Sequence, residues 1–446
     1  MDYYEFLQRK TQLDGDSGFE PVWIPDFLYD FQRVLLKWSC RKGRSAIFAD
    51  CGLGKTPIQL AWADNVVRYT NGRVLVLTPL AVAGQTEKEA KKFGIDAKVS
   101  RNGTLGPTKI IITNYERLHY FTASDFIGCI CDESSILKNF NGVTKAAITE
   151  FMRLIPYRLL CTATAAPNDY IELGTSSEAL GYLTRQHMLA QFFTHDGSDT
   201  AKWRLKGHAR SDLFWRWMCS WSRALRRPSD LGFSDGLFEL PPLIVRDHVV
   251  ATIPGDGLLF AVPAVGLAEQ RAERRSTIEA RCELAAAMVS TTTEPAVCWC
   301  HLNDEGNLLE RLIPGAVQVA GKDTDERKEE VLEAFSTGKI RVLVTKPTIA
   351  GWGLNWQHCA HQTFFPSHSF EQWYQAIRRS WRFGQTHQVI IDVITSEGEA
   401  DVMANMERKQ HQADAMFENI VGRMSRLCET QKVEKASRKV MVPSWL

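Results

Sequence analysis

The chain has 446 residues, more than one hydrophobic core usually organises, so we expect two or three domains. Its composition, 44% hydrophobic and 24% charged, is typical of a globular protein and excludes a disordered or fibrous one. The 53 Lys and Arg residues nearly balance the 52 Asp and Glu residues, so the net charge of +1 gives no overall attraction to nucleic acid. Any surface that binds nucleic acid must therefore be local.

The N-terminal ten residues are acidic and aromatic where a signal peptide would have a cationic start and an apolar stretch. The sequence contains no run of about 18 apolar residues, the length that a membrane helix needs. The eleven cysteines are scattered, and most lie in apolar runs such as residues 129–131 and 298–300, which is typical of buried thiols. We therefore expect a cytoplasmic protein with no membrane partner.

Two series of short β-rich apolar runs alternate with helix-like stretches, one from residue 45 to 161 and the other from about Pro295 onward. This rhythm predicts an α/β fold with two parallel-sheet lobes in tandem. The expected strands of the first series are residues 46–49, 74–77, 110–112, 126–131 and 158–161, and those of the second are 297–300, 317–319, 342–345, 363–365 and 389–394.

Residues 181–242 interrupt this rhythm with four tryptophans, several arginines and three prolines that favour turns. We expect a helical insert and a hinge here. Phe214, Trp217, Trp221 and Leu225 recur at helical spacing, which favours a packing stripe over a platform for stacking bases.

The expected domains are residues 1–180 and 243–405 as the two lobes, 181–242 as the insert and 406–446 as a C-terminal helical tail. From Val421 to Leu446 the tail holds six Lys or Arg residues against two Glu residues. This composition favours a solvated helix over a weak phosphate contact.

A phosphate-binding loop is indicated between the first expected strand and a helix-like run at residues 58–67. Its glycines let backbone N–H groups turn toward phosphates, Lys55 can neutralise the β and γ oxygens, and the Thr56 hydroxyl can hold Mg²⁺. Ala49 replaces the usual first glycine of such loops but is also small. The expected nucleotide-binding residues are Gly52, Leu53, Gly54, Lys55 and Thr56.

Two carboxylates, Asp132 and Glu133, follow the apolar run 126–131. They are expected at the carboxyl edge of a parallel sheet, where ligands collect. Asp132 is suited to coordinate Mg²⁺, and Glu133 to orient and deprotonate a water that attacks the γ-phosphate. An acid pair that merely stabilises a helix N-terminus is the alternative, and the phosphate loop upstream disfavours it.

The residues around these motifs resemble the Swi/Snf-like branch of helicase superfamily two. Residues 132–139 (DESSILKN) resemble its Asp-Glu box, and residues 159–168 (LLCTATAAPN) resemble its third motif. The resemblance implies that Thr162 and Thr164 couple hydrolysis to lobe movement. Residues 28–33 (LYDFQR) resemble the segment whose glutamine reads adenine, which makes Gln32 the candidate.

Two short segments resemble first-lobe motifs that bind one nucleic-acid strand. They are Thr78-Pro79 and residues 112–116 (ITNYE), which include Thr113 and Asn114. In the second lobe, residues 342–355 (VLVTKPTIAGWGLN) resemble the fifth motif. There the resemblance implies that Thr345 and Lys346 contact nucleic acid and that Gly353 lies at the nucleotide. Such backbone contacts would make binding largely independent of sequence. Family members usually have a small residue where Trp352 stands.

The sixth motif is resembled by residues 371–385 (EQWYQAIRRSWRFGQ), with Arg378 where the family usually has glycine. The resemblance makes Arg379 and Arg382 the arginine fingers that stabilise charge on the transferred phosphoryl group, and gives Gln375 a coupling role. These three residues have the i, i+4, i+7 spacing of one helix face.

The resemblance spans about residues 25–400, with the motifs in family order, and is greatest to the compact versions in bacteria and phages. It implies two RecA-like lobes and an ATPase that uses Mg²⁺ and ATP to translocate on DNA. Duplex DNA is the expected track, and RNA is less favoured. A strand-separating DNA or RNA helicase and a scaffold that has lost hydrolysis remain alternatives. The second lobe disfavours a small-molecule kinase, and the adjacent Cys298, Cys300 and His301 do not have zinc spacing.

Overall fold

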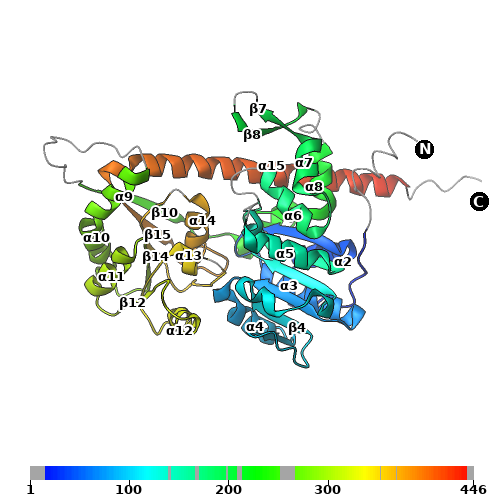
Figure 1. Cartoon of the computed structure of the whole chain (residues 1–446), viewed down its shortest axis with the longest axis horizontal. Helices are drawn as coiled ribbons and strands as arrows, with labels where there is room; N and C mark the ends of the chain where they lie inside the picture. The colour runs from blue at the N-terminus through cyan, green and yellow to red at the C-terminus, as the bar shows by residue number, and fades with distance from the viewer. Residues whose placement is uncertain are drawn as a thin grey trace, which may run out of the picture. The chain divides into compact units, whose positions relative to one another are not determined.

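The computed structural model describes residues 16–138, 142–165, 170–196, 199–207, 213–251, 267–351, 353–367 and 369–438. The N-terminal ten residues, Trp352, and parts of the expected Asp-Glu box and third motif, residues 139 and 166–168, lie outside these ranges. The chain divides into two compact units (Figure 1). The first unit comprises residues 1–78, 86–236 and 413–446, and the second comprises 79–85 and 237–412.

The first unit contains a seven-stranded sheet in the order β3-β4-β2-β5-β6-β1-β9. All neighbouring strands run parallel. Nearly every residue of its central strands is buried, as expected for a sheet covered on both faces. The strands are β1 (Arg44–Ala49), β2 (Val74–Thr78), β3 (Ala97–Val99), β4 (Ile110–Asn114), β5 (Gly128–Asp132), β6 (Tyr157–Thr162) and β9 (Ser222–Leu225).

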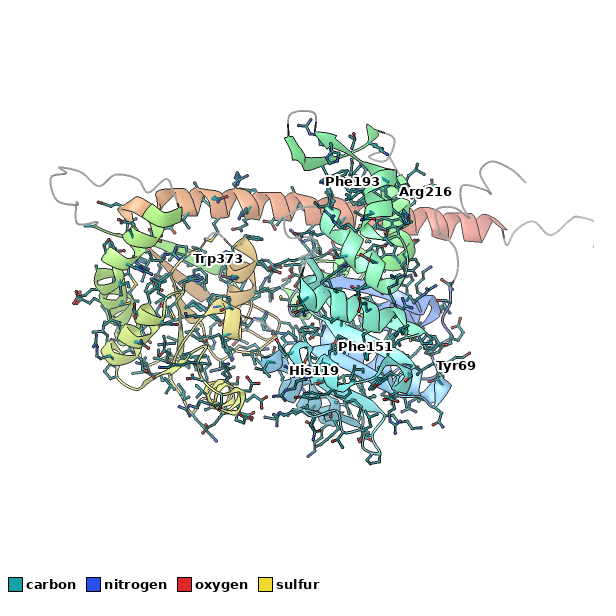
Figure 2. All side chains as sticks on the ribbon, in the orientation of Figure 1. Tyr69, His119, Phe151, Phe193, Arg216 and Trp373 are labelled. Carbon is teal, nitrogen blue, oxygen red and sulfur yellow. The ribbon has the colours of Figure 1, made fainter. Side chains whose placement is uncertain are left out.

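Helices join these strands, and side chains fill the space between helices and sheet (Figure 2). Phe151 of α5, for example, packs against Phe126 with ring centroids 6.2 Å apart. The helices are α2 (Asp30–Lys42), α3 (Lys55–Thr70), α4 (Ala83–Lys92), α5 (Val143–Arg153), α6 (Leu173–Leu180), α7 (Arg185–Phe192) and α8 (Phe214–Trp221).

The second unit contains a six-stranded sheet in the order β10-β15-β14-β11-β13-β12, again with parallel neighbours throughout. Its strands are β10 (Leu243–Val250), β11 (Ala296–Trp299), β12 (Ala316–Val319), β13 (Val342–Thr345), β14 (His361–Phe364) and β15 (Val389–Ser396). Its helices are α9 (Leu267–Ser276), α10 (Ile278–Ser290), α11 (Asn303–Leu312), α12 (Asp325–Ser336), α13 (Pro347–Ala350) and α14 (Phe370–Ile377). The α/β class and the two parallel sheets are thus confirmed.

The segment 181–242 is not wholly helical, and that prediction is wrong in part. Besides α7 and α8 it contains an antiparallel hairpin, β7 (Phe193–Asp196) with β8 (Asp199–Leu205), and the sheet strand β9. Phe214, Trp217 and Trp221 are buried in the core of the first unit, so the packing interpretation of this aromatic stripe is confirmed for them. Leu225 is also buried but lies on β9, beyond the helix that ends at Trp221.

Helix α15 (Ala400–Arg438) begins among the residues of the second unit, and its part from Ala413 onward belongs to the first. Phe417, Ile420, Val421 and Met424 are buried in the core of the first unit. The expectation of a solvated helix is therefore wrong at Val421 and Met424, because the apolar residues upstream extend a buried face to them. Among the described residues, every helix is too short or too polar to cross a lipid bilayer.

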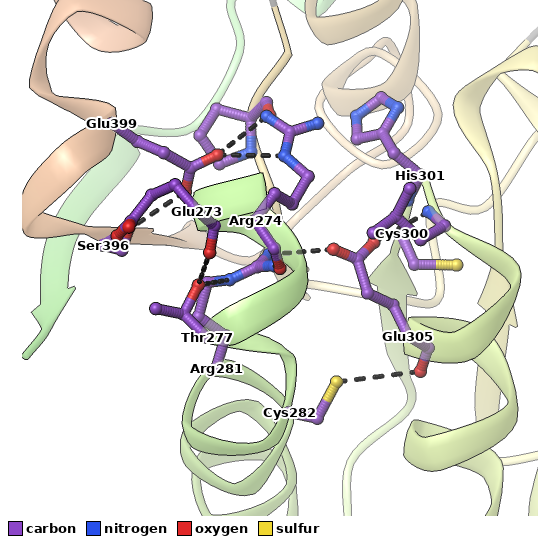
Figure 3. A network of polar contacts seen from close by, with 12 residues as sticks. Glu273, Arg274, Thr277, Arg281, Cys282, Cys300, His301, Glu305, Ser396 and Glu399 are labelled. Atoms are coloured by element: carbon purple, nitrogen blue, oxygen red, sulfur yellow. Dashed lines mark hydrogen bonds and ion pairs between the residues drawn. The ribbon is translucent and has the colours of Figure 1, made fainter. Parts of the chain in front are cut away.

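A buried polar network lies in the second unit at the start of α11 (Figure 3). Arg281 and Glu305 form an ion pair at 2.9 Å with both side chains fully buried. Glu305 also accepts hydrogen bonds from the backbone N–H groups of His301 and Leu302, at 2.8 and 2.9 Å. Helix α10 and the beginning of α11 are thereby fastened together by charge-assisted contacts.

Replacing Glu305 with Gln is expected to lower the free energy of unfolding of the second unit by about 3–5 kcal/mol, because Arg281 would keep a buried charge without a partner carboxylate. Urea unfolding of the full-length chain measures the loss. Glu330→Gln is a matched control that removes an exposed pair with Arg327, with an expected cost within about 1 kcal/mol. Equal losses in the two variants would contradict the role assigned to the buried pair.

Candidate functional site

The loop between β1 and α3 has the backbone of a phosphate cradle. Gly52 and Gly54 have φ angles of 87° and 76°, which favour glycine, and Gly54 caps the N-terminus of α3. The Lys55 Nζ donates to the backbone oxygens of Ala49 and Asp50, at 3.0 and 3.5 Å. The ammonium group is therefore folded back over its own loop, where it can meet an anion bound to the N–H groups of α3.

Gln32 of α2 lies directly against this loop. Its Nε2 donates to the backbone oxygen of Leu53 at 2.9 Å, and its Oε1 accepts from the backbone N–H of Tyr29 at 3.0 Å. A methyl group on Gly54 would clash with the Gln32 amide, so this contact also requires glycine there. The residue expected to read adenine thus adjoins the expected phosphate loop.

Asp132 is the last residue of β5, and Glu133 follows it with a φ of 51°, in the left-handed region. Strand β6 separates β5 from β1, so the carboxyl ends of β5 and β1 lie at the same edge of the sheet. Both carboxylates are buried, with exposed fractions of 6% and 5%. Burial without partners would be costly, so each carboxylate needs a donor.

Those donors come from α3 and from the end of β6. The Gln59 Nε2 donates to Asp132 Oδ1 at 2.7 Å, and the Thr162 Oγ1 donates to Glu133 Oε2 at 3.2 Å. The Thr162 hydroxyl in turn accepts from the backbone N–H of Thr164 at 3.1 Å. The structure therefore connects Glu133 to Thr162 directly and to Thr164 through the Thr162 hydroxyl.

Gln59 was missing from the expected site. Its signal in the sequence is its position four residues after Lys55, since residues at i and i+4 share one face of a helix. Gln59 is buried, and its amide holds one oxygen of Asp132 in place.

Burial, and next the charge of Glu133, raise the pKa of Asp132 from 3.8 to about 6; the Gln59 hydrogen bond and the Lys55 charge act in the opposite direction. Burial also raises the pKa of the Cys161 and Cys131 thiols well above their usual range. These neighbouring sulfurs therefore stay protonated.

The donor chemistry fits a magnesium ion. A carboxylate oxygen of Asp132 and the hydroxyl of Thr56 are hard oxygen ligands, and Mg²⁺ in nucleotide sites takes one or two protein ligands along with phosphate oxygens and water. No cluster of three or more His, Cys, Asp or Glu residues suited to a metal occurs in the described ranges.

Three of the residues expected to contact nucleic acid lie together at the ends of β2 and β4 in the first unit: Thr78, Thr113 and Asn114. Pro79, the next residue after β2, is grouped with the second unit. Thr78 is paired in register with Asn114, and the Thr78 Oγ1 donates to the Thr113 backbone oxygen at 3.5 Å. The side chains of these three residues are buried, and only Pro79 is partly exposed. The three buried side chains therefore pack at the carboxyl ends of β2 and β4.

In the second unit, Arg379 and Arg382 lie side by side but not on a helix. Helix α14 ends at Ile377, so the expectation of one helix face is wrong for the two arginines. Tertiary hydrogen bonds gather them instead: both guanidinium groups donate to the Leu354 backbone oxygen, at 3.2 and 3.0 Å. Arg379 also donates to Gln375 Oε1 at 3.0 Å.

The remaining predicted residues of the second unit lie nearby in the chain. Gly353, with a φ of 70°, immediately precedes Leu354. Thr345 is buried at the end of β13 and its Oγ1 donates to the Val319 backbone oxygen at 3.2 Å, while the Lys346 Nζ donates to Asn303 Oδ1 at 2.7 Å. The Thr345 hydroxyl is therefore bound to backbone inside the sheet, whereas the Lys346 ammonium group contacts a side chain at the start of α11.

The chain matches no protein-family model and no curated protein sequence.

Replacing Asp132 with Asn is expected to stabilise the nucleotide-free protein above about pH 6. Because the folded-state pKa is raised, folded Asp132 keeps its proton between about pH 4 and about pH 6, so the free energy of unfolding falls as pH rises through this window. The buried charge then costs about 2–3 kcal/mol at higher pH. Asparagine cannot ionise, and its oxygen can still accept from Gln59.

Thermal unfolding of both proteins without Mg²⁺, from about pH 4 to about pH 8, measures this difference. The advantage of the Asn variant should grow up to about pH 6 and then stay constant, whereas Asp125→Asn, at an exposed position, should show no such growth. A pH-independent difference would refute the raised pKa.

Proposed function

We propose that this protein is a nucleic-acid-dependent ATPase of the helicase superfamily two type that translocates along duplex DNA. In this proposal the two units are RecA-like lobes, and the protein acts in the cytoplasm. The observation that carries it is the joining of three elements in the first unit: the Lys55 loop, the Asp132–Glu133 pair at the same sheet edge, and the Thr162 hydroxyl bound to Glu133.

Substrate binding follows from the loop. The N–H groups at the start of α3 and the Lys55 ammonium group bind the phosphates of ATP, and Gln32 lies where the loop meets α2. Mg²⁺, when bound, neutralises charge on the β- and γ-phosphates. Asp132 and Thr56 would be its protein ligands.

Hydrolysis follows from Glu133. The carboxylate accepts a proton from a water molecule as the water oxygen forms a bond to the γ-phosphorus, and the bond from that phosphorus to the bridging oxygen of ADP breaks. Thr162 orients the carboxylate through its 3.2 Å hydrogen bond, and the neighbouring Thr164 N–H fixes the Thr162 hydroxyl. A change in the charge of Glu133 would therefore change the hydrogen bonds of Thr162 and, through them, the segment that follows β6.

The second unit supplies cations. Arg379 and Arg382 share one carbonyl acceptor, Leu354, and in the proposed cycle they exchange that oxygen for phosphate oxygens of the transition state. Charge stabilisation from the second unit would make hydrolysis depend on lobe closure, which is the physical basis of ATP-driven movement along a strand.

Two alternatives differ in products and in turnover. A strand-separating DNA or RNA helicase would share this site, and a nucleic-acid-binding scaffold would keep the fold without hydrolysis. The hydrogen-bonded carboxylates favour an active enzyme, because a scaffold has no need to keep Asp132 and Glu133 buried and oriented.

The test is ATP hydrolysis without nucleic acid and with duplex DNA, single-stranded DNA or RNA. Stimulation by duplex DNA supports the proposal, whereas stimulation by RNA alone supports the RNA alternative. Products from tailed duplexes report strand separation. Absence of hydrolysis under every condition would leave the scaffold.

Replacing Glu133 with Gln is expected to lower the turnover number at least ~10²-fold while ATP affinity stays close to that of wild type, because the amide cannot take the proton from water. Steady-state kinetics and binding of a fluorescent ATP analogue separate the two quantities. Glu150→Gln on the exposed face of α5 is the matched control. Normal turnover in the Glu133 variant would remove the base from this position.

Replacing Arg382 with Ala is expected to reduce stimulated turnover by up to ~10³- to 10⁵-fold, the range for arginine fingers, with little effect on ATP affinity. The same kinetics apply, with Arg408→Ala on an exposed part of α15 as the control. Unchanged stimulated hydrolysis would show that Arg382 does not reach the reacting phosphate.

A further inference from the structure

The segment that carries the two arginines is attached to the chain that links the units. One passage from the first unit to the second lies between Gly236 and Leu237. The residues that follow, Leu237 to Pro242, belong to the second unit, and we call them the linker segment.

Two side chains that flank Arg382 contact the linker segment. The preceding residue, Trp381, donates its Nε1–H to the Pro241 backbone oxygen at 2.7 Å. The following residue, Phe383, stacks on Phe238 with ring centroids 4.7 Å apart and an interplanar angle of 26°. The residues immediately before and after Arg382 therefore both contact the linker segment.

The other side of the arginine segment is fastened to the loop after α13. Besides the two guanidinium contacts to Leu354, the Trp356 N–H donates to the Arg379 backbone oxygen at 2.9 Å, and the Gln357 Nε2 donates to the Phe383 backbone oxygen at 3.2 Å. The arginine segment is thus held between that loop and the linker segment.

Further contacts fix Trp381 and the linker segment in place. Arg378 lies over the Trp381 ring at 4.4 Å and over the Tyr374 ring at 5.2 Å, which ties Trp381 back to α14. The Val389 N–H, at the start of β15, donates to the Pro242 backbone oxygen at 3.1 Å, which anchors the linker segment to the sheet. Arg378, at the position where the resembled family has glycine, therefore has a packing role.

We propose that Trp381 and Phe383 are positioning residues that place Arg382 according to the conformation of the linker segment. This inference rests on the proposed function. A change in linker path that accompanies lobe movement would pull on the residues immediately before and after Arg382, so the approach of its guanidinium to phosphate becomes sensitive to the linker. Neither Trp381 nor Phe383 needs to touch ATP for this effect.

The test uses the full-length chain with Trp381→Phe, which keeps a ring for Arg378 but removes the N–H donor, and Phe383→Leu, which removes the stacked ring. Each variant is expected to lower stimulated kcat about 10- to 100-fold while KM for ATP and the affinity for a fluorescent ATP analogue stay unchanged, because misplacement of about 1 Å suffices for such a loss. Phe383→Tyr, which keeps the ring, should have the kcat of the wild type.

Leu309→Ala serves as the control for stability, since Leu309 is buried in a core cluster of the same unit that contains no residue of the linker segment. It should lower the melting temperature without lowering kcat per folded molecule. If the wild type shows stimulated hydrolysis and both variants keep its kcat, or if kcat falls only in proportion to stability as in the control, the inference is overturned. Absence of stimulated hydrolysis in the wild type would instead overturn the proposed function.

Discussion

The burial of two adjacent carboxylates at the end of β5 is the constraint on which the first unit depends. A carboxylate out of water must be held by hydrogen-bond donors or lose its charge. Gln59 on α3 and Thr162 on β6 supply those donors, so the helix that follows the glycine-rich loop and the strand between β5 and β1 are both tied to the pair. Helix α3 and the segment after β6 are thereby linked through a few buried polar atoms.

In the second unit, buried cations also need partners. Its buried cations are satisfied in two ways: Arg281 by the carboxylate of Glu305, and Arg379 by the neutral oxygens of Leu354 and Gln375. A full ion pair fixes its partners firmly, whereas neutral acceptors leave an arginine able to exchange them for a more strongly charged oxygen. This difference suits Arg281 to a structural role and Arg379 to the proposed contact with phosphate.

Most of the strands were predictable because each is a short apolar run buried on both faces, as at β2 and β13. Three of the sheet strands that were not expected lack this signal. Strand β3 has only three residues, β9 reads Ser-Arg-Ala-Leu, and β10 is a sheet edge with several exposed residues. These strands exist because a neighbouring strand offers its backbone groups. For β9 and β10 that partner, β1 or β15, is far away in the sequence, whereas β3 pairs with the next strand, β4.

The sequence by itself determined the α/β class, the glycine-rich loop between β1 and α3 and the acid pair at the end of β5, because each depends on local order: strand, glycine-rich turn and helix, or strand and carboxylate. Tertiary structure alone decided that Gln59 and Thr162 hold those carboxylates and that Arg379 and Arg382 meet at Leu354 beyond the end of α14. The physical reason is that a local pattern fixes where a polar group leaves the backbone, whereas the partner that satisfies it after burial comes from whichever distant segment the packing brings beside it.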